Sequence, residues 1–363
     1  MQVTIVGLPG SGKTTVFNAL TGAQADTGGF SGGRAAPNMG VVKVPDERLD
    51  RLTELFHPRK TVPADVTYVD VAIPAGATRE GTINPDVLAL VRNADALLHV
   101  ARAFDAGAEG PADPWRDVEA LDLEFAIADL MVIEKRLEKL RTSGRHGSPA
   151  EKEANAQEEA LLARLEPELS AGRPLRAVTL TEDDELRLRG YRFLTQKPVL
   201  VVLSIDEAQL AGAAELEAAG RARYGQQQAD VAALAGKIEA ELAQLSEDDA
   251  ALFMEDLGIA EPSRGRVIHL TYALLGLFSF FTAGEDECRA WTLRQGANAV
   301  DAAAAIHSDL ARGFIRAEVV TYDDLIACGS MAEARKRGLL RSEGKTYAVR
   351  DGDVIEVLFN VAR

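Results

Sequence analysis

Short apolar runs separated by longer amphipathic stretches make up the first half of the chain and part of the second. Four of these runs, at residues 2–6, 66–71, 96–101 and 199–203, consist mostly of apolar residues. Runs of this length without strict alternation are typical of strands that are buried on both faces of a parallel sheet. Because helical stretches lie between them, the pattern predicts an α/β fold built on a doubly wound sheet.

A long helical interval separates the third of these runs from the fourth. Apolar residues recur there at spacings of three and four, at Leu123, Ile127, Leu130, Ile133, Leu137 and Leu140. The break at residues 142–149 contains Ser-Gly, His-Gly and Ser-Pro pairs, which favour a turn. A second amphipathic run follows through Leu161, Leu165 and Leu169. We therefore expect two helices that fold back on each other as a hairpin.

The last part of the chain has a different texture, with short strand-like runs and turns. Residues 289–293 read as a strand, residues 299–310 as a helix, and Asp351-Gly352 between two alternating runs predicts a β-hairpin. A small β-rich domain is expected here. The length of 363 residues also favours more than one domain.

The strongest chemical signal is the sequence GLPGSGKT at Gly7–Thr14, placed between the first predicted strand and a helix. Its glycines let backbone N–H groups approach phosphate oxygens, and the N-terminus of the following helix favours negative charge. A glycine-rich turn that binds nothing is the alternative. The required strand and helix context favours phosphate binding.

Each residue type in this loop has a task in phosphate chemistry. Lys13 reaches the β- and γ-phosphates, Thr14 offers a hydroxyl to Mg²⁺, and Asp70 at the end of a neighbouring strand supports the same ion. Lys13 and Asp70 are the catalytic candidates, although Asp70 alone also suits a capping or surface carboxylate. The residues expected to contact the phosphates are Gly7, Gly10, Ser11, Gly12, Lys13, Thr14 and Thr15.

Charge and composition limit the partners and the compartment. The formal net charge of −16 excludes nonspecific nucleic-acid binding by the whole surface, and DNA is not an expected partner. Two cysteines, Cys288 and Cys328, are too few for a disulfide framework. Because the first predicted strand begins at the second residue, we expect no signal peptide, and the most apolar stretch is too short for a bilayer. We expect a cytoplasmic monomer without a membrane contact.

The motifs in order along the chain carry a resemblance. GLPGSGKTTVFNALTG, APNMGVVKVPDERLDRL, YALLGLFSFFTAGEDECRAWTLRQG and EGKTYAVRDGDVI are similar, collinearly, to the YchF or Obg-like ATPase family. The resemblance implies a discontinuous P-loop NTPase domain at residues 1–118 and 196–275. It further implies an α-helical coiled-coil insertion at 119–195 and a TGS domain of the ubiquitin-like β-grasp type at 276–363.

The resemblance also implies ATP or GTP as ligand, Mg²⁺ as cofactor, ATP preferred over GTP, and association with the ribosome. Contacts to rRNA would come from basic residues of the hairpin and the last domain. These are Lys135, Arg136, Lys139, Arg141, Arg145, Arg335, Lys336, Arg337, Arg341 and Lys345. The alternative is that these side chains are solvated and balanced by neighbouring glutamates.

Two switch regions depart from the family pattern. Arg34 stands where the family has the threonine that completes the Mg²⁺ shell, and Ser31 in the nearby glycine-rich segment is a candidate substitute that nothing in the sequence requires. The motif that begins at Asp70 has Ile73 and Pro74 where the family has a glycine whose N–H meets the γ-phosphate. Proline has no N–H and favours an extended residue before it. We therefore expect that this segment does not close on the γ-phosphate as it does in the family.

The base-recognition motif is also altered. The family's Asn-x-x-Glu reads Ser204-Ile205-Asp206-Glu207 here, so the amide that distinguishes the bases is missing. Ile205 can pack on the purine face, or can be an ordinary buried residue at a strand end. Lys237 can lie over the base. The preference for ATP or GTP stays open.

Three functions are compatible with these residues. The leading one is a nucleotide-binding protein that hydrolyses ATP or GTP slowly and acts on translation or stress responses at the ribosome. The alternative is a nucleotide-binding scaffold with little or no turnover, because its switches are altered. A small-molecule kinase shares GSGKTT, but would explain neither the helical insertion nor the last domain.

Overall fold

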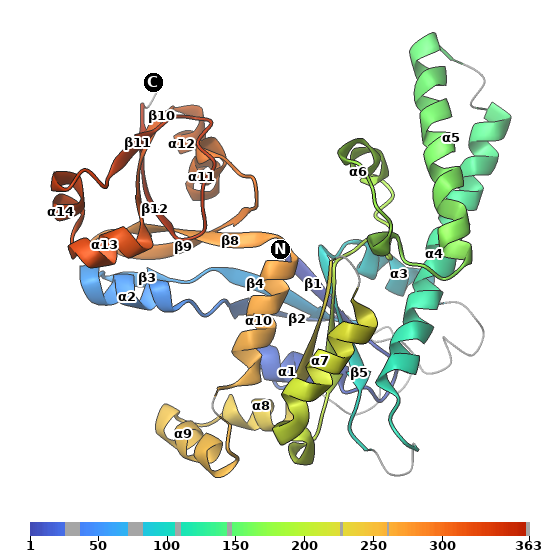
Figure 1. The fold of residues 1–363 in the computed structure, drawn as a ribbon, viewed down its shortest axis with the longest axis horizontal. Coiled ribbons are helices and arrows are strands. Elements are labelled where there is room, and N and C mark those ends of the chain that lie inside the picture. The colour runs from blue at the N-terminus through green and yellow to red at the C-terminus, as the bar shows by residue number, and fades with distance from the viewer. Residues whose placement is uncertain are drawn as a thin grey trace. The chain divides into compact units, whose positions relative to one another are not determined.

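The computed structural model describes residues 1–25, 37–71, 83–105, 110–143, 147–225, 228–259 and 261–360. It forms two compact units, the first from residues 1–41 and 67–267, the second from residues 42–66 and 268–363. Both are drawn in Figure 1. Each unit contains its own sheet.

The first unit is organised around a six-stranded sheet. The strand order is β2 (Asn38–Lys43), β4 (Asp65–Asp70), β1 (Gln2–Val6), β5 (Ala96–Arg102), β6 (Val199–Ser204) and β7 (Ala229–Leu234). β1 pairs in parallel with β4 and β5, and β5, β6 and β7 continue the parallel ladder. All four predicted runs are strands, so the expected α/β fold is confirmed. The loop after β1 lies at the carboxyl edge of this sheet, where such folds bind ligands.

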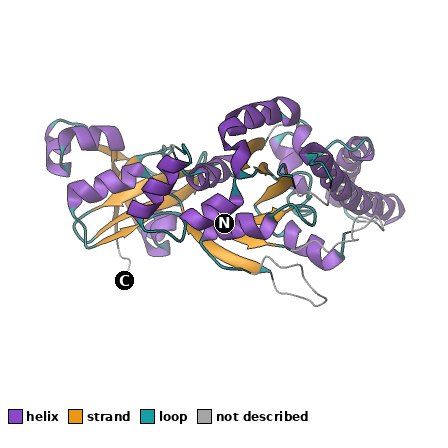
Figure 2. Ribbon diagram, turned by 90° about the horizontal axis from the view of Figure 1, so that it is seen from below, coloured by secondary structure: helices purple, strands orange, loops and turns teal. Residues whose placement is uncertain are grey.

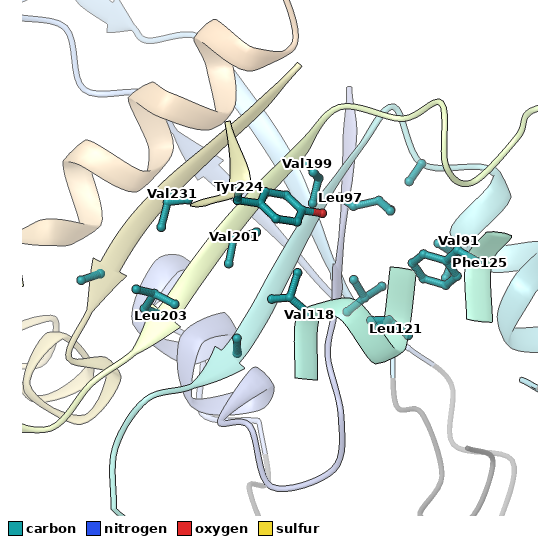
Figure 3. Close-up of a cluster of buried hydrophobic side chains, with 14 of the residues drawn as sticks. Val91, Leu97, Val118, Leu121, Phe125, Val199, Val201, Leu203, Tyr224 and Val231 are labelled. Atoms are coloured by element: carbon teal, nitrogen blue, oxygen red, sulfur yellow. The ribbon is translucent and has the colours of Figure 1, made fainter. Parts of the chain in front are cut away.

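Helices connect these strands and bury their apolar sides. They are α1 (Lys13–Thr21), α3 (Pro85–Arg92), α6 (Glu182–Leu188), α7 (Ala213–Tyr224), α8 (Gly236–Leu242) and α9 (Glu247–Asp256). The division between the two units falls within α10 (Ser263–Leu274). Figure 3 shows one face of β6, with Val199, Val201 and Leu203, in one cluster with Tyr224 and with Val118, Leu121 and Phe125 of the helical insertion. Full burial of such side chains stabilises the fold by roughly 1.5–3 kcal/mol each.

The helical insertion consists of α4 (Pro114–Ser143) and α5 (Pro149–Ser170), which pack against each other along the predicted apolar faces. Figure 1 labels both helices, and Figure 2 shows helical ribbon, in purple, at the corresponding right-hand end of the view. A capping box starts α5, because Ser148 accepts from Glu151 N while Glu151 accepts from Ser148 N. Thr181 and Asp184 cap α6 in the same way. The turn at residues 142–149 is described only in part.

The predicted apolar face of α4 is wrong at its N-terminal half. Leu123 and Ile127 are 51% and 37% exposed. The buried stripe instead continues through Leu121, Phe125 and Asp129. The carboxylate of Asp129 is fully buried and accepts hydrogen bonds from the backbone N–H groups of Leu194 and Thr195. Because a charged residue occupies this buried position, the apolar pattern did not indicate the correct face of the helix.

The second unit has a six-stranded sheet of its own. Its order is β11 (Arg341–Glu343), β10 (Phe314–Thr321), β12 (Asp353–Phe359), β8 (Leu277–Ala283), β9 (Glu287–Arg294) and β3 (Lys60–Val62). Its helices are α2 (Glu47–Phe56), α11 (Ala299–Ile306), α12 (Ser308–Arg312), α13 (Tyr322–Cys328) and α14 (Met331–Lys336). Alanines of α11 pack on Phe280 and Val319 of the sheet, as expected for a small β-rich domain. The predicted helix at 299–310 is broken at His307, whose side chain accepts from Asp309 N and caps α12.

The β-hairpin predicted at Asp351-Gly352 is also wrong. A turn is present, but the residues before it form only one bridge, from Ala348 to Asn298, and β12 pairs with β10 and β8 instead. Asp351 accepts from Ser279 N and Asp353 accepts from Arg350 N. These bonds turn the chain out of the sheet before β12 begins.

Residues 42–66 lie with the C-terminal residues. β3 pairs in parallel with β9, and Arg48 of α2 donates to Asp351 at 2.9 Å while lying over the Phe281 ring. The division into three domains remains a prediction. These contacts place residues 42–66 beside the predicted last domain, residues 276–363. In the described ranges no helix is both long and apolar enough to cross a bilayer.

Candidate functional site

The glycine-rich loop between β1 and α1 has a backbone that only glycine tolerates at key points. Gly7, Gly10 and Gly12 have φ angles of 153°, 78° and 88°. A β-carbon at Gly7 would lie 2.3 Å from the carbonyl oxygen of Val100. The loop therefore keeps close to β5, and the first turn of α1 follows it directly.

Lys13 is held inside this loop. Its ammonium donates to the Leu8 carbonyl at 3.0 Å. Burial lowers the pKa of Lys13 to about 8, and the Asp70 carboxylate opposes part of that effect. A phosphate group in the loop would offer the ammonium an anionic partner in place of a neutral carbonyl.

Thr14 and Asp70 form the second part of the site. Thr14 Oγ1 donates to Asp70 Oδ2 at 2.9 Å, and Asn38 Nδ2 lies 3.5 Å from the same oxygen. Asp70 ends β4 and is 3% exposed. Its other oxygen, Oδ1, is buried without a hydrogen bond, as is Ser11 Oγ. Unsatisfied buried oxygens of this kind are expected where a ligand completes a site.

A hydroxyl beside a carboxylate fits a hard cation such as Mg²⁺. Among the described residues no group of three or more His, Cys, Asp or Glu could hold a metal by itself. This fits Mg²⁺ as well, because Mg²⁺ takes most of its ligands from phosphate and water. Thr14 and Asp70 are the residues that would hold it.

The three residues predicted to contact the base have different surroundings. Ser204 ends β6 next to the loop, since a β-carbon on Gly12 would lie 3.0 Å from its Oγ. Ile205 is buried in the core cluster below it. Lys237 is exposed at the start of α8, whose Gly236 lies close to Thr15. The structure thus brings Ser204, Thr15 and the start of α8 to one end of the loop.

Two neighbours of the loop were not singled out from the sequence. Phe104 donates its N–H to the Ser204 carbonyl, and its ring would lie 3.7 Å from a β-carbon on Gly12. Asn38 approaches Asp70. An aromatic residue just past the end of a parallel strand was the available signal for Phe104. The positions Ser31, Arg34, Ile73 and Pro74 lie outside the described residues.

A buried polar cluster lies behind the site, on the α4 side of the sheet. Arg176 donates to both oxygens of Asp122, at 2.6 and 2.7 Å, and to the Tyr224 hydroxyl at 2.6 Å. Nearby, His99 of β5 is 2% exposed, and burial lowers its pKa to about 4. His99 is therefore neutral at physiological pH. This cluster joins α4, the segment after the hairpin and α7.

Comparison with known proteins gives consistent matches over the whole chain. Residues 2–135 match the family described as "50S ribosome-binding GTPase", and residues 277–360 match YchF-GTPase_C, described as a protein of unknown function. The "Ribosome-binding ATPase YchF" of Bacillus subtilis is 40% identical over 98% of both chains. The chain belongs to the YchF family. Another member, the "Ribosome-binding ATPase YchF" of Escherichia coli O157:H7, is 36% identical over 98% of both chains.

A solved member of the YchF family has the same fold. The structure of the Schizosaccharomyces pombe YchF GTPase superposes with a TM-score of 0.85 at 28% identity, covering 99% of this chain and 97% of that chain. The resemblance inferred from the motifs is confirmed. The glycine-rich loop, Thr14 and Asp70 therefore lie in a P-loop domain of a YchF-family protein.

Most of the basic residues predicted to contact rRNA are paired with carboxylates. Arg136 pairs with Glu158 at 2.6 Å and Arg141 with Glu159 at 3.5 Å. In the second unit, pairs of 2.5–3.7 Å join Arg335 to Glu318, and Lys336 and Arg337 to Glu333, while Arg341 contacts Glu343 at 3.5 Å. Arg145 lies outside the described residues. These pairs favour the interpretation of balanced, solvated faces at the positions that have them.

Proposed function

We propose that the chain binds a purine nucleoside triphosphate with Mg²⁺ at the loop between β1 and α1 and hydrolyses it slowly. The observation that carries the proposal is the set Lys13, Thr14 and Asp70, together with the unsatisfied Asp70 Oδ1. The names of the relatives, which describe an ATPase and a GTPase, agree with it. ATP and GTP are both candidates, because Ser204 stands where the family has the base-reading asparagine.

Each residue of this set has a defined part in binding. The amides of the loop and the Lys13 ammonium hold the phosphates, and Thr14 and Asp70 orient oxygens toward the metal. Mg²⁺ supplies neutralisation of the charge that develops on the phosphate oxygens.

Calorimetric titration of ATP and of GTP, each with Mg²⁺, tests binding. We expect at least one to bind, and a Lys13→Ala variant to lose most of the affinity while Lys152→Ala on the exposed side of α5 keeps it. Single-turnover hydrolysis then tests catalysis. If nucleotide binds but the wild type and Lys13→Ala hydrolyse it at equal rates, the chain has the scaffold function instead. Absence of binding at millimolar nucleotide would overturn the proposal.

We also propose that the chain associates with the ribosome and regulates translation or a stress response there. The support is the name given to its relatives and the match of residues 2–135 to a family of ribosome-binding GTPases. Cosedimentation with purified ribosomes at low salt is the test. Failure to pellet with ribosomes under those conditions, with and without nucleotide, would contradict it.

A further inference from the structure

A groove lies between α3 and the outer face of α4, within the first unit. It has a volume of about 840 Å³, and three of its lining residues, Val132, Arg136 and Tyr191, also contact the hairpin core or α5. Figure 1 shows α3 beside the lower part of α4. Neither the phosphate loop nor the base-reading residues contribute to its lining.

Exposed apolar side chains form the floor of the groove. Ile127 and Met131 of α4 are 37% and 59% exposed, and Ile83, Leu88 and Ala89 line the opposite wall. Large apolar side chains gathered in a concave surface are typical of interaction sites rather than of ordinary solvent-exposed helices. The floor is thus a face of α4 on which, among the described residues, Ile127 and Met131 are left partly uncovered.

The rim of the groove carries basic side chains. Its lining includes Arg92, Lys135, Arg136 and Lys139 together with the carboxylate of Glu124. Arg92 and Arg136 are paired with Asp129 and Glu158, which lie outside the lining, so Lys135 and Lys139 give the end of the groove toward the hairpin tip its basic character. This differs from the whole chain, whose net charge is −16. Ile127, Met131, Lys135 and Lys139 follow one another at intervals of four along α4, so the apolar part passes into a basic part toward the hairpin tip.

We propose that this groove binds an acidic, amphipathic segment of a partner protein. The segment would place apolar side chains against Ile127 and Met131 and carboxylates beside Lys135 and Lys139. The charge complementarity and the row of residues at helical spacing both favour a helix laid along α4. The proposal does not depend on nucleotide binding, because no residue of the phosphate loop takes part.

The floor distinguishes such a segment from RNA. Binding of single-stranded RNA uses aromatic side chains on which bases stack. The one aromatic residue in the lining, Tyr191, has its ring stacked on Phe193 with centroids 5.0 Å apart and donates its hydroxyl to Glu158. Its ring is thus already engaged, and the rest of the floor is aliphatic or thioether.

Selection from a phage-displayed library of random peptides of about 15 residues, roughly four helical turns, tests the proposal on the full chain. We expect enriched peptides with apolar residues at helical spacing and an excess of Asp and Glu. Fluorescence anisotropy with one such labelled peptide should show that Met131→Glu and Lys135→Glu each weaken binding about tenfold or more. Leu186→Glu and Lys152→Glu, at exposed positions outside the groove, serve as matched controls and should bind as the wild type.

Several results would overturn the proposal. Enrichment without acidic or periodic apolar residues would do so, as would selected peptides that bind Met131→Glu as well as the wild type. A labelled single-stranded RNA that loses affinity in Lys135→Glu but not in Met131→Glu, with no enriched peptide, would assign the surface to nucleic acid instead. Because Met131 and Lys135 are exposed, the circular dichroism spectra and the nucleotide affinities of the variants should equal those of the wild type. A loss of peptide binding can therefore be distinguished from a failure of the proposed nucleotide binding.

Discussion

Lys13 is a residue whose charge depends strongly on its surroundings. Burial in the loop lowers its pKa to about 8, so the ammonium loses its proton within a range that solution experiments can reach. In the unfolded chain the value returns toward 10.5. The unfolded state therefore binds more protons between these two values, and without nucleotide the free energy of unfolding should rise with pH there.

This pKa gives a prediction for nucleotide binding. Affinity for ADP is expected to fall as the pH rises above 8, because a neutral amine no longer attracts the phosphates. Calorimetric titration at several pH values measures the effect. Lys13→Arg is the control, since arginine stays charged over this range and its affinity should not change with pH. An identical pH profile for both proteins would contradict the role of Lys13.

Gly7 allows a second prediction at this scale. Gly7→Ala should lower the free energy of unfolding by about 1–3 kcal/mol, because the new β-carbon would meet the Val100 carbonyl at 2.3 Å and the φ of 153° disfavours side chains. Urea denaturation measures it. Gly212→Ala, with no heavy atom within 4 Å of its new β-carbon, should change stability little. Equal midpoints for the two variants would show that the loop relaxes.

Sequence reasoning located the residues of the loop because their signal is local. The order of glycines, Lys13 and Thr14 is contained in one segment, and Asp70 ends a recognisable strand. Asn38 and Phe104 were not identified, because their proximity to Asp70 and Gly12 depends on how the chain folds between β1 and β5. The positions of Arg34 and Ile73 stay predictions about the switches.

At the scale of elements, hydrogen bonds of Asp129 link α4 to the segment that follows the hairpin. Its carboxylate accepts from Leu194 N, Thr195 N and Thr195 Oγ1, and pairs with Arg92 at 3.0 Å. Burial raises the pKa of this carboxyl, and the Thr195 hydrogen bond opposes the rise. The residue is thus a polar anchor in an otherwise apolar stripe.

Removing this anchor should destabilise the protein. Asp129→Ala leaves two backbone N–H groups and Arg92 without their partner, so we expect a loss of about 3 kcal/mol or more in the free energy of unfolding. Asp183→Ala removes an exposed partner of Arg187 and should cost about 0.5 kcal/mol or less. Thermal and urea unfolding compare the two. Similar losses would mean that Asp129 contributes no more than a surface ion pair.

The elements themselves were mostly foreseeable, while some connections were not. Parallel strands and the helical hairpin follow from apolar spacing alone. The register of α4 was missed because burial of Asp129 depends on backbone donors far along the chain. The turn at Asp351-Gly352 has the expected local chemistry. However, β12 pairs with β10 and β8 and not with the residues just before the turn, and such long-range pairing cannot be predicted from the local pattern.

At the scale of the whole molecule, the net charge of −16 limits how the chain can meet an RNA surface. Most of the candidate basic residues in the second unit already pair with glutamates. Lys345 is exposed, and no ion pair of its ammonium is seen within the described ranges. Ribosome association should therefore depend on few contacts.

We predict that Lys345→Glu reduces cosedimentation with ribosomes, whereas Lys43→Glu, at another exposed position, does not. Raising the salt concentration from about 50 to about 200 mM should weaken the wild-type interaction as well, because phosphate contacts release counterions. The pelleted fraction measured across this range gives the slope. Binding that is insensitive both to salt and to Lys345→Glu would indicate a contact with ribosomal protein instead.

The pairing of β3 with β9 has a consequence for synthesis. A nascent chain produces Lys60 early, yet its ladder partner Glu287 emerges only after the whole first unit has been translated. Residues 42–66 must therefore wait without their sheet, and a C-terminal fragment made alone would expose the edge of β9. Maturation of the second unit is thus tied to completion of the polypeptide, and its refolding should be the slower of the two.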